Sequence, residues 1–121
     1  MILLDTYTLI GLYSEPQRLS ATAKSLVEDS EIPLFVSAIS SWEICIAVQK
    51  RRLVLEVDPI LWFEKAITKH SVQVLDVTWR IAANSTRLPR HHADPADRII
   101  IATAIDQRLR LLTPEACSIG I

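Results

Sequence analysis

Glycine is scarce in this chain, which has only Gly11 and Gly120 among its 121 residues. Loops that hold phosphate with backbone amides need several glycines at fixed spacing, so Walker-type and dinucleotide-type phosphate loops are excluded. Cysteine is equally scarce, and Cys45 and Cys117 form no metal or redox motif. We therefore expect two reduced thiols in an intracellular protein.

Long apolar runs and a large net charge of either sign are also lacking. No stretch approaches the ~18 consecutive apolar residues of a membrane-spanning helix. The apolar run at the N-terminus stops at Asp5, and no basic region accompanies it as in a signal peptide. We therefore expect a cytoplasmic protein with no membrane partner. The formal net charge of −1 predicts no global attraction to polyanions, so nucleic-acid binding would depend on local basic groups.

Half of the residues are hydrophobic, and they follow an alternating pattern. A chain of this length is expected to form one domain, residues 1–121, with one core. Short apolar runs predict strands at residues 2–4, 34–36, 72–75 and 110–112. Longer periodic segments predict helices at residues 21–29, 39–50, 59–70, 79–88 and 95–108. The strands are apolar at odd and even positions alike, as in a sheet covered on both faces. This predicts an α/β fold, a three-layer α/β/α sandwich with a short, mainly parallel central sheet.

Two acidic residues follow predicted strands. Asp5 comes directly after the first strand, and Glu115 lies just beyond the last. Ligands of such sheets bind outside the carboxyl ends of the strands, so both residues are placed at the ligand-binding edge. Each also has a purely structural interpretation: Asp5 suits the N-cap of a helix beginning near Thr6, and Pro-Glu is a common helix opening.

Glu43 lies inside a predicted helix, on a face that it shares with Ile39, Trp42, Ile46 and Ala47. A glutamate in such an apolar row reaches water poorly, which favours a functional role. An ion pair with a nearby arginine or lysine, or an interaction with the helix dipole, would also explain it.

Asp94 and Asp97 open the last predicted helix. Asp94 suits the N-cap, Pro95 the first helical position and Asp97 the third, which is a complete helix-start signal without any chemistry. However, Asp97 also shares one face with Ile100 and Ile101, so it heads a row of apolar side chains. Both aspartates are therefore candidate site residues.

Several acids gathered in one pocket require a counter-ion. Two like charges ~4 Å apart repel by roughly 4 kcal/mol at an effective dielectric near 20, against a total stability of about 5–15 kcal/mol. Either some acids stay protonated or a cation binds among them. Donor sets made only of oxygen favour Mg²⁺ or Mn²⁺ over Zn²⁺. The sequence thus indicates a metal-assisted hydrolase in which Asp5, Glu43, Asp97 and Asp94 are the candidate metal-binding and catalytic carboxylates.

The three tryptophans, Trp42, Trp62 and Trp79, fall at helical positions. We expect them to anchor the core rather than to stack against a ligand.

Three segments together resemble PIN-domain ribonucleases, and more closely the VapC-type toxins of bacterial toxin–antitoxin pairs. They are Met-Ile-Leu-Leu-Asp-Thr at residues 1–6, Ser-Ala-Ile-Ser-Ser-Trp-Glu-Ile at 37–44, and the segment 88–104 that contains Asp94 and Asp97. The resemblance extends to about Glu115. It implies Mg²⁺- or Mn²⁺-dependent cleavage of RNA, with Asp5, Glu43 and Asp97 as the acidic core and Asp94 beside them. It also implies a homodimer and a cognate antitoxin whose C-terminal segment blocks the active-site groove.

The chain departs from the family pattern at three places. Glu115 replaces the usual aspartate, Tyr7 stands where many relatives have histidine, and Arg51 where many have glycine. These changes bear on metal binding and on the choice of substrate. Candidate phosphate contacts are the basic side chains Lys50, Arg51, Arg52, Arg87, Arg90 and Arg98.

Two other functions compete with this interpretation. A catalytically silent PIN-like module that binds RNA or protein would keep the fold without the reaction. A signalling receiver domain would use Asp76, after the third strand, as phosphoacceptor. The receiver is disfavoured because a single acid follows the first strand and no lysine occurs beyond Lys69.

Overall fold

The computed structural model describes residues 1–89, 94–115 and 117–118. Its strands are β1 (Ile2–Leu4), β2 (Leu34–Ser37), β3 (Gln73–Leu75), β4 (Arg110–Leu112) and β5 (Cys117–Ser118). Its helices are α1 (Thr6–Ser14), η1 (a 3₁₀ turn, Pro16–Arg18), α2 (Ala21–Glu28), α3 (Ala38–Gln49), α4 (Pro59–Lys69), α5 (Trp79–Ser85) and α6 (Pro95–Gln107). None of the helices in these ranges is long and apolar enough to cross a membrane.

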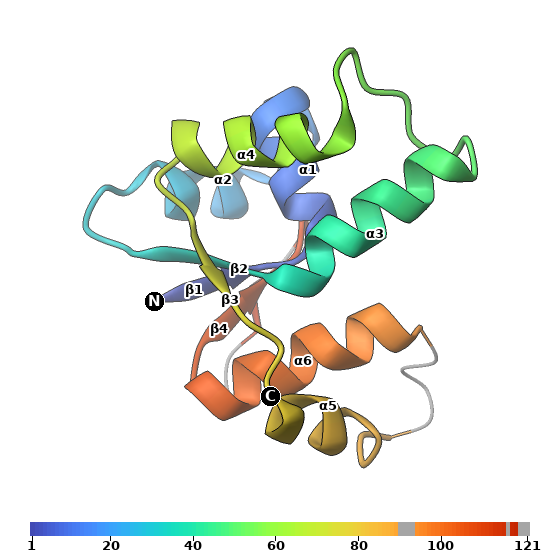
Figure 1. Ribbon diagram of the computed structural model, residues 1–121. Helices are drawn as coiled ribbons and strands as arrows, with labels where there is room; N and C mark the ends of the chain where they lie inside the picture. The colour runs from blue at the N-terminus through green and yellow to red at the C-terminus, as the bar shows by residue number, and fades with distance from the viewer. Residues whose placement is uncertain (90–93, 116, 119–121) are drawn as a thin grey trace.

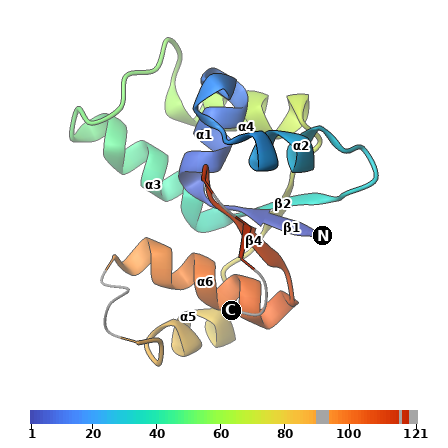
Figure 2. The same ribbon diagram turned by 180° about the vertical axis from the view of Figure 1, so that it is seen from behind.

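The strands form one sheet in the order β3-β2-β1-β4-β5. The pairs β1–β2, β1–β4 and β2–β3 are parallel, and β5 runs antiparallel to β4. Helices α1, α2 and α4 cover one face, α5 and α6 cover the other, and α3 extends from the carboxyl end of β2 (Figures 1 and 2). The connections change face between β1 and β4, and in α/β sheets such a switch point opens a ligand crevice beyond the strand ends.

Odd and even positions of the central strand, β1, are all apolar because helices cover both of its faces. Ile2 and Leu4 pack into the cluster formed with α1, α2 and α4, whereas Leu3 packs against Ile100 and Ile101 of α6. All three residues of β1 are completely buried. Burial of this kind contributes about 1.5–3 kcal/mol per large aliphatic side chain, so β1 holds the three layers together.

The predicted fold class is confirmed, and each predicted strand and helix is present, β1 and β4 with the predicted bounds and the others with shifted ends. The helix predicted for residues 79–88 ends at Ser85. The sequence pattern did not predict β5 or η1, because segments of two or three residues are too short to show a period.

The expectation for the tryptophans is right for one and wrong for two. Trp62 is 4% exposed, but Trp42 is 53% and Trp79 is 76% exposed. Helix α3 buries the face of Ser40 and Ile44 instead of the face that carries Trp42. Its other positions are also largely apolar, so the sequence alone did not show which face turns inward.

Candidate metal centre

Asp5 is fixed at the carboxyl end of β1, where it caps α1. Its Oδ1 accepts a hydrogen bond from the Thr8 N–H at 2.7 Å and lies 2.7 Å from the Thr8 hydroxyl. That hydroxyl is also 2.8 Å from the carbonyl oxygen of Leu112 in β4. The N-cap interpretation is therefore correct, and the cap holds the carboxylate at the sheet edge where ligands are expected.

Glu43 extends from α3 toward the same edge. The Thr6 hydroxyl donates a short hydrogen bond to Glu43 Oε1 and lies 2.8 Å from the Ser40 hydroxyl. Thr6 and Ser40 are buried, and Glu43 is half-buried. Within the described ranges no lysine or arginine pairs with Glu43, which argues against the ion-pair alternative.

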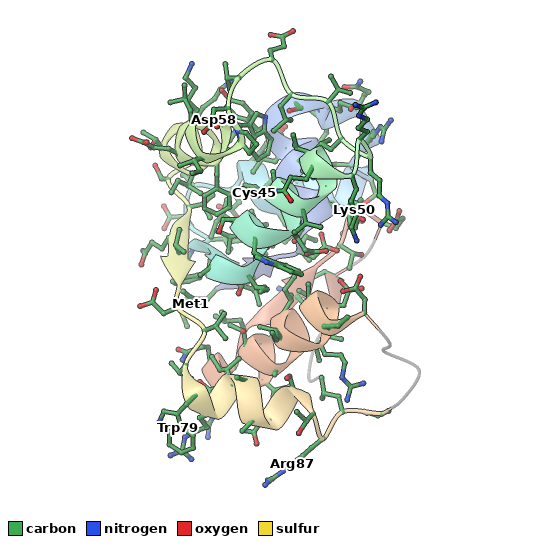
Figure 3. All side chains as sticks on the ribbon, turned by 45° about the vertical axis from the view of Figure 1, so that its right-hand side comes forward. Met1, Cys45, Lys50, Asp58, Trp79 and Arg87 are labelled. Atoms are coloured by element: carbon green, nitrogen blue, oxygen red, sulfur yellow. The ribbon has the colours of Figure 1, made fainter. Side chains whose placement is uncertain are left out.

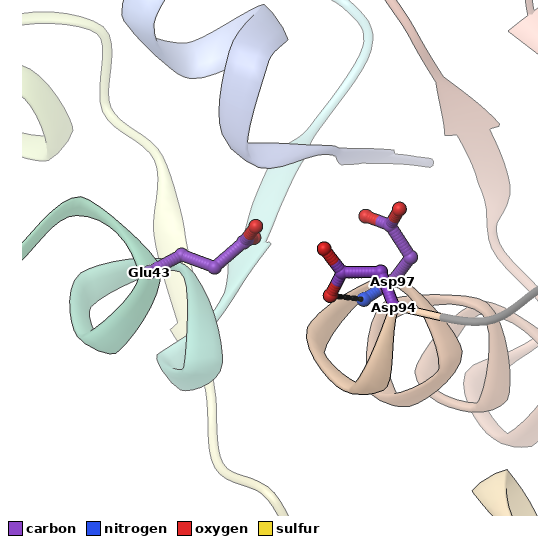
Figure 4. Close-up of side chains that lie close together, drawn as sticks. All are labelled: Glu43, Asp94 and Asp97. Carbon is purple, nitrogen blue, oxygen red and sulfur yellow. Dashed lines mark hydrogen bonds between the residues drawn. The ribbon is translucent and has the colours of Figure 1, made fainter. Parts of the chain in front are cut away.

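Asp94 and Asp97 lie at the start of α6, facing Glu43 across the gap between the two helices (Figure 4). Asp94 is the N-cap, and its Oδ1 accepts from the Ala96 N–H at 2.9 Å and from the Asp97 N–H at 3.4 Å. Carboxylate oxygens of Glu43, Asp94 and Asp97, one from each, all lie within 4.8 Å of one another. Two helices distant in sequence thus bring three acids together.

This group differs from the predicted ligand set of Asp5, Asp97 and Glu43. Among the described residues the compact group contains Asp94 in place of Asp5. Asp5 lies beside the group, close enough for the charge of Asp97 to act on it. The sequence predicts Asp94 beside the ligands, because a helix-start signal does not show where the carboxylate points.

Burial raises the pKa of the Asp5 carboxyl. The hydrogen bonds from the Thr8 hydroxyl and N–H oppose this, and the charges of Asp97 and Glu115 raise the pKa further. Glu115, exposed beyond β4, therefore lies within electrostatic reach of the site although it is not in the compact group.

Burial also raises the pKa of Glu43. The Thr6 hydroxyl opposes the shift, while the charges of Asp97, Asp94 and Asp5 add to it. The charged forms of Asp5 and Glu43 are therefore both disfavoured in the metal-free protein, which is the electrostatic condition that a bound cation relieves.

The residues present fit a divalent cation of the Mg²⁺ type. The grouped donors are all carboxylate oxygens, without histidine or cysteine. The chemistry of the donors favours Mg²⁺ or Mn²⁺ over Zn²⁺.

Sequence reasoning missed the hydroxyl residues that orient the acids: Thr6, Thr8 and Ser40. Spacing could have found them. Thr6 and Thr8 closely follow Asp5, and Ser40 lies three residues before Glu43, which makes the two residues neighbours on the surface of α3.

The predicted phosphate contacts have different outcomes. The Arg98 guanidinium donates to the carbonyl oxygens of Ser85 at 3.0 Å, Leu88 at 2.9 Å and Pro89 at 3.1 Å. Arg98 thus binds the chain's own backbone between α5 and α6, and its contact with phosphate stays a prediction. Arg90 lies outside the described residues.

Lys50 and Arg51 are exposed at the carboxyl end of α3. Lys50 follows Glu43 by seven residues, which is two helical turns on the same face and roughly 10 Å along the axis. Figure 3 shows Lys50 at the end of α3, on the same side of the molecule as the start of α6. These two residues remain predicted phosphate contacts.

Comparisons with known proteins identify the family of this chain. The family model for the PIN domain matches residues 2–115. Ribonuclease VapC22 of Mycobacterium tuberculosis is 35% identical over 115 residues, which cover 94% of this chain and 86% of that protein.

Solved structures give the same result. A toxin–antitoxin complex from Klebsiella pneumoniae matches with a TM-score of 0.65 and 26% identity over 93% of this chain and 85% of that one. FitAcB from Neisseria gonorrhoeae matches with a TM-score of 0.56 and 26% identity, covering 93% and 86% of the two chains. The chain therefore belongs to the PIN-domain family, as a VapC-type member.

Proposed function

We propose that this protein is a Mg²⁺- or Mn²⁺-dependent endoribonuclease and the toxin of a toxin–antitoxin pair. The observation that carries the proposal is the group of Glu43, Asp94 and Asp97 oxygens within 4.8 Å of one another, at the sheet edge that also holds Asp5. The similarity to a protein named as a ribonuclease supports RNA as the substrate. The similarity to a toxin–antitoxin complex supports an antitoxin partner.

In the proposed mechanism Glu43, Asp94 and Asp97 hold the cation. When bound, Mg²⁺ or Mn²⁺ supplies polarisation of a phosphate oxygen and a lowered pKa for a water ligand. Asp5, which lies beside the ligands and has a raised pKa, is assigned as acceptor of the proton from the attacking water. Thr8 keeps this carboxylate in place through Oδ1, and Thr6 does the same for Glu43.

The remaining proposals concern assembly and location. We propose that residues 1–121 act as one domain, as a homodimer, in the cytoplasm. A cognate antitoxin would silence the enzyme by placing its C-terminal segment in the active-site groove. These proposals rest on the family resemblance.

Metal-dependent cleavage of RNA is the direct test. Purified protein should cut mixed single-stranded RNA in Mg²⁺ or Mn²⁺, lose the activity in EDTA, and regain it when excess metal is added. Gel electrophoresis of labelled RNA measures the products. A protein that binds RNA but cuts none with either ion would instead be the catalytically silent module.

Thermal stability gives a second test that needs no substrate. At a hundredfold excess over Kd, Mn²⁺ contributes about 2.7 kcal/mol, so Tm should rise by on the order of 10 °C for a domain of this size. The response should shrink as the pH falls through the raised pKa values of Asp5 and Glu43, because protons compete with the cation for these carboxylates. Melting curves over a pH series, in EDTA and in Mn²⁺, provide the measurement.

The pH dependence in EDTA has a definite sign. Because the pKa values of Asp5 and Glu43 are raised on folding, the folded protein binds more protons than the unfolded chain. This contribution to stability is complete below the ordinary carboxyl range and is lost as the pH rises through the raised pKa values.

Glu43→Gln, which keeps the oxygen that accepts the hydrogen bond from Thr6, should be more stable than wild type in EDTA at neutral pH. The Tm of this variant should also respond less to Mn²⁺. A Tm indifferent to Mn²⁺ in the wild type would contradict the metal site.

A further inference from the structure

A pocket of about 350 Å³ lies between α1, η1 and the segment after β4. Its walls include Tyr7, Gly11, Glu15, Arg18 and Glu115, together with apolar side chains. The volume is within the range of small-molecule sites, about 300–1,000 Å³. Nothing in the mechanism above uses this pocket.

The pocket adjoins the metal centre on two sides. On one wall, Tyr7 follows Thr6, whose hydroxyl binds Glu43. On the other, Glu115 is close enough for its charge to act on Asp5. A group bound in the pocket would therefore lie next to a phosphate held at the metal centre.

The lining combines a flat apolar surface with a polar rim. The Tyr7 side chain is 64% exposed, so its ring is accessible to a planar ligand. At the rim, Arg18 and Glu15 form an ion pair, which offers hydrogen-bond donors and an acceptor side by side. Gly11 has no side chain to fill the space, and even a Cβ there would lie 3.0 Å from Leu19 Cδ2.

The charges of the lining select the ligand class. Glu15 and Glu115 oppose an isolated anion, so a free phosphate is a poor occupant. A neutral planar group with donors and acceptors on its edge suits both the exposed ring and the Glu15–Arg18 pair. An unstacked nucleobase has this form, and aromatic stacking is a general mode of binding single-stranded RNA.

We propose that this pocket is a subsite for one unpaired base of the RNA, next to the cleaved phosphate, with Tyr7 as the stacking residue. The Glu15–Arg18 pair then contacts the base edge and sets base preference. The proposal rests on the proposed ribonuclease function, and it adds a specificity-determining residue to it.

The test uses a series of single-stranded RNA oligonucleotides that contain one mapped cleavage site. In each member a different nucleotide is replaced by an abasic one, and kcat/KM is measured with Mn²⁺. For wild type we expect one position beside the cut where loss of the base lowers kcat/KM roughly 10- to 100-fold. Tyr7→Ala should show this loss on the intact RNA and no further loss on the abasic one.

Two variants and one physical readout complete the design. Tyr7→Phe keeps the stacking face and should retain wild-type behaviour. Trp79→Ala removes another exposed aromatic, at the start of α5, and should leave kcat/KM unchanged. The Mn²⁺-induced rise in Tm should be the same in Tyr7→Ala as in wild type, which separates lost stacking from a damaged metal centre.

The failures are distinguishable. If wild type cuts no RNA in any metal, the proposed function fails and this inference with it. If wild type cuts RNA but Tyr7→Ala remains sensitive to the same abasic position, only the base subsite is wrong. If Tyr7→Ala cuts every oligonucleotide as wild type does but resists inhibition by a peptide of the antitoxin C-terminus, the pocket holds the protein partner, and the base subsite is again overturned.

Discussion

Asp97→Asn is expected to lower kcat for RNA cleavage at least about 100-fold while leaving the protein folded. Asparagine keeps the size of the side chain but removes the negative charge from one of the three grouped oxygen donors. Residues that only orient the ligands of a metal are worth 10–100-fold in affinity or activity, and Asp97 is itself a proposed ligand, so its loss should cost at least as much. A loss that excess Mn²⁺ partly restores would indicate that metal affinity is the affected step.

The fold should persist because Asp97 is exposed at the start of α6, and the cap that begins the helix belongs to Asp94. Removing one of several like charges also reduces the repulsion within the group. Asp106→Asn, an exposed acid near the other end of α6, is the matched control and should keep full activity. Circular dichroism melts of both variants in EDTA check folding. Full activity in a folded Asp97→Asn would remove Asp97 from the metal centre.

The position of the acids at the sheet edge could be predicted because strand ends are visible in the sequence. Asp5 follows three apolar residues that are completely buried as β1, and in a parallel sheet the residue after a strand lies at the carboxyl edge. The apolar periodicity of α6 likewise placed Ile100 and Ile101 in the core and Asp97 at the head of their row.

The composition of the acidic group could not be predicted, because it depends on side-chain direction. Asp94 fulfils every requirement of an N-cap, and that signal needs no second role. The cap bonds use Oδ1, and a carboxylate has two oxygens, so capping and metal binding are compatible. Only the position of α3 relative to α6 brings Glu43 into the same group, and no local pattern determines the packing of two such distant helices.

The face of α3 that is buried was also beyond the sequence pattern. Apolar residues surround this helix, so the row of Ile39, Trp42 and Glu43 was as plausible a buried face as the row that contains Ser40 and Ile44. The buried face of α3 is the one that packs against α1, where the Ser40 hydroxyl contacts the Thr6 hydroxyl. Glu43 is next to this contact, and its orientation follows from it.

Arg98 has a structural role that the sequence pattern did not predict. A basic side chain in the first turn after two aspartates was expected to contact phosphate. Its guanidinium instead donates from Nε and from both terminal nitrogens to three backbone carbonyls at the end of α5 and just beyond it. The fork of donors in arginine suits several acceptors at once, whereas lysine presents a single point charge. Arg98 therefore fixes the end of α5 against the start of α6, which carries Asp94 and Asp97.

Arg98→Lys is consequently expected to destabilise the protein by about 2–4 kcal/mol, because hydrogen bonds to charged groups contribute about 1.5–3 kcal/mol each and Arg98 is only half-buried. Urea unfolding should show a lower midpoint with an unchanged m-value. Activity should fall through kcat, since the segment that positions the α6 acids is loosened. The salt dependence of RNA affinity should stay as in wild type. Arg80→Lys, at an exposed position in α5, is the matched control and should change neither the urea midpoint nor kcat. A stable Arg98→Lys would refute the structural role. Arg98→Ala tests the alternative role. If this variant reduces the slope of log RNA affinity against log salt by about one, Arg98 contacts a phosphate.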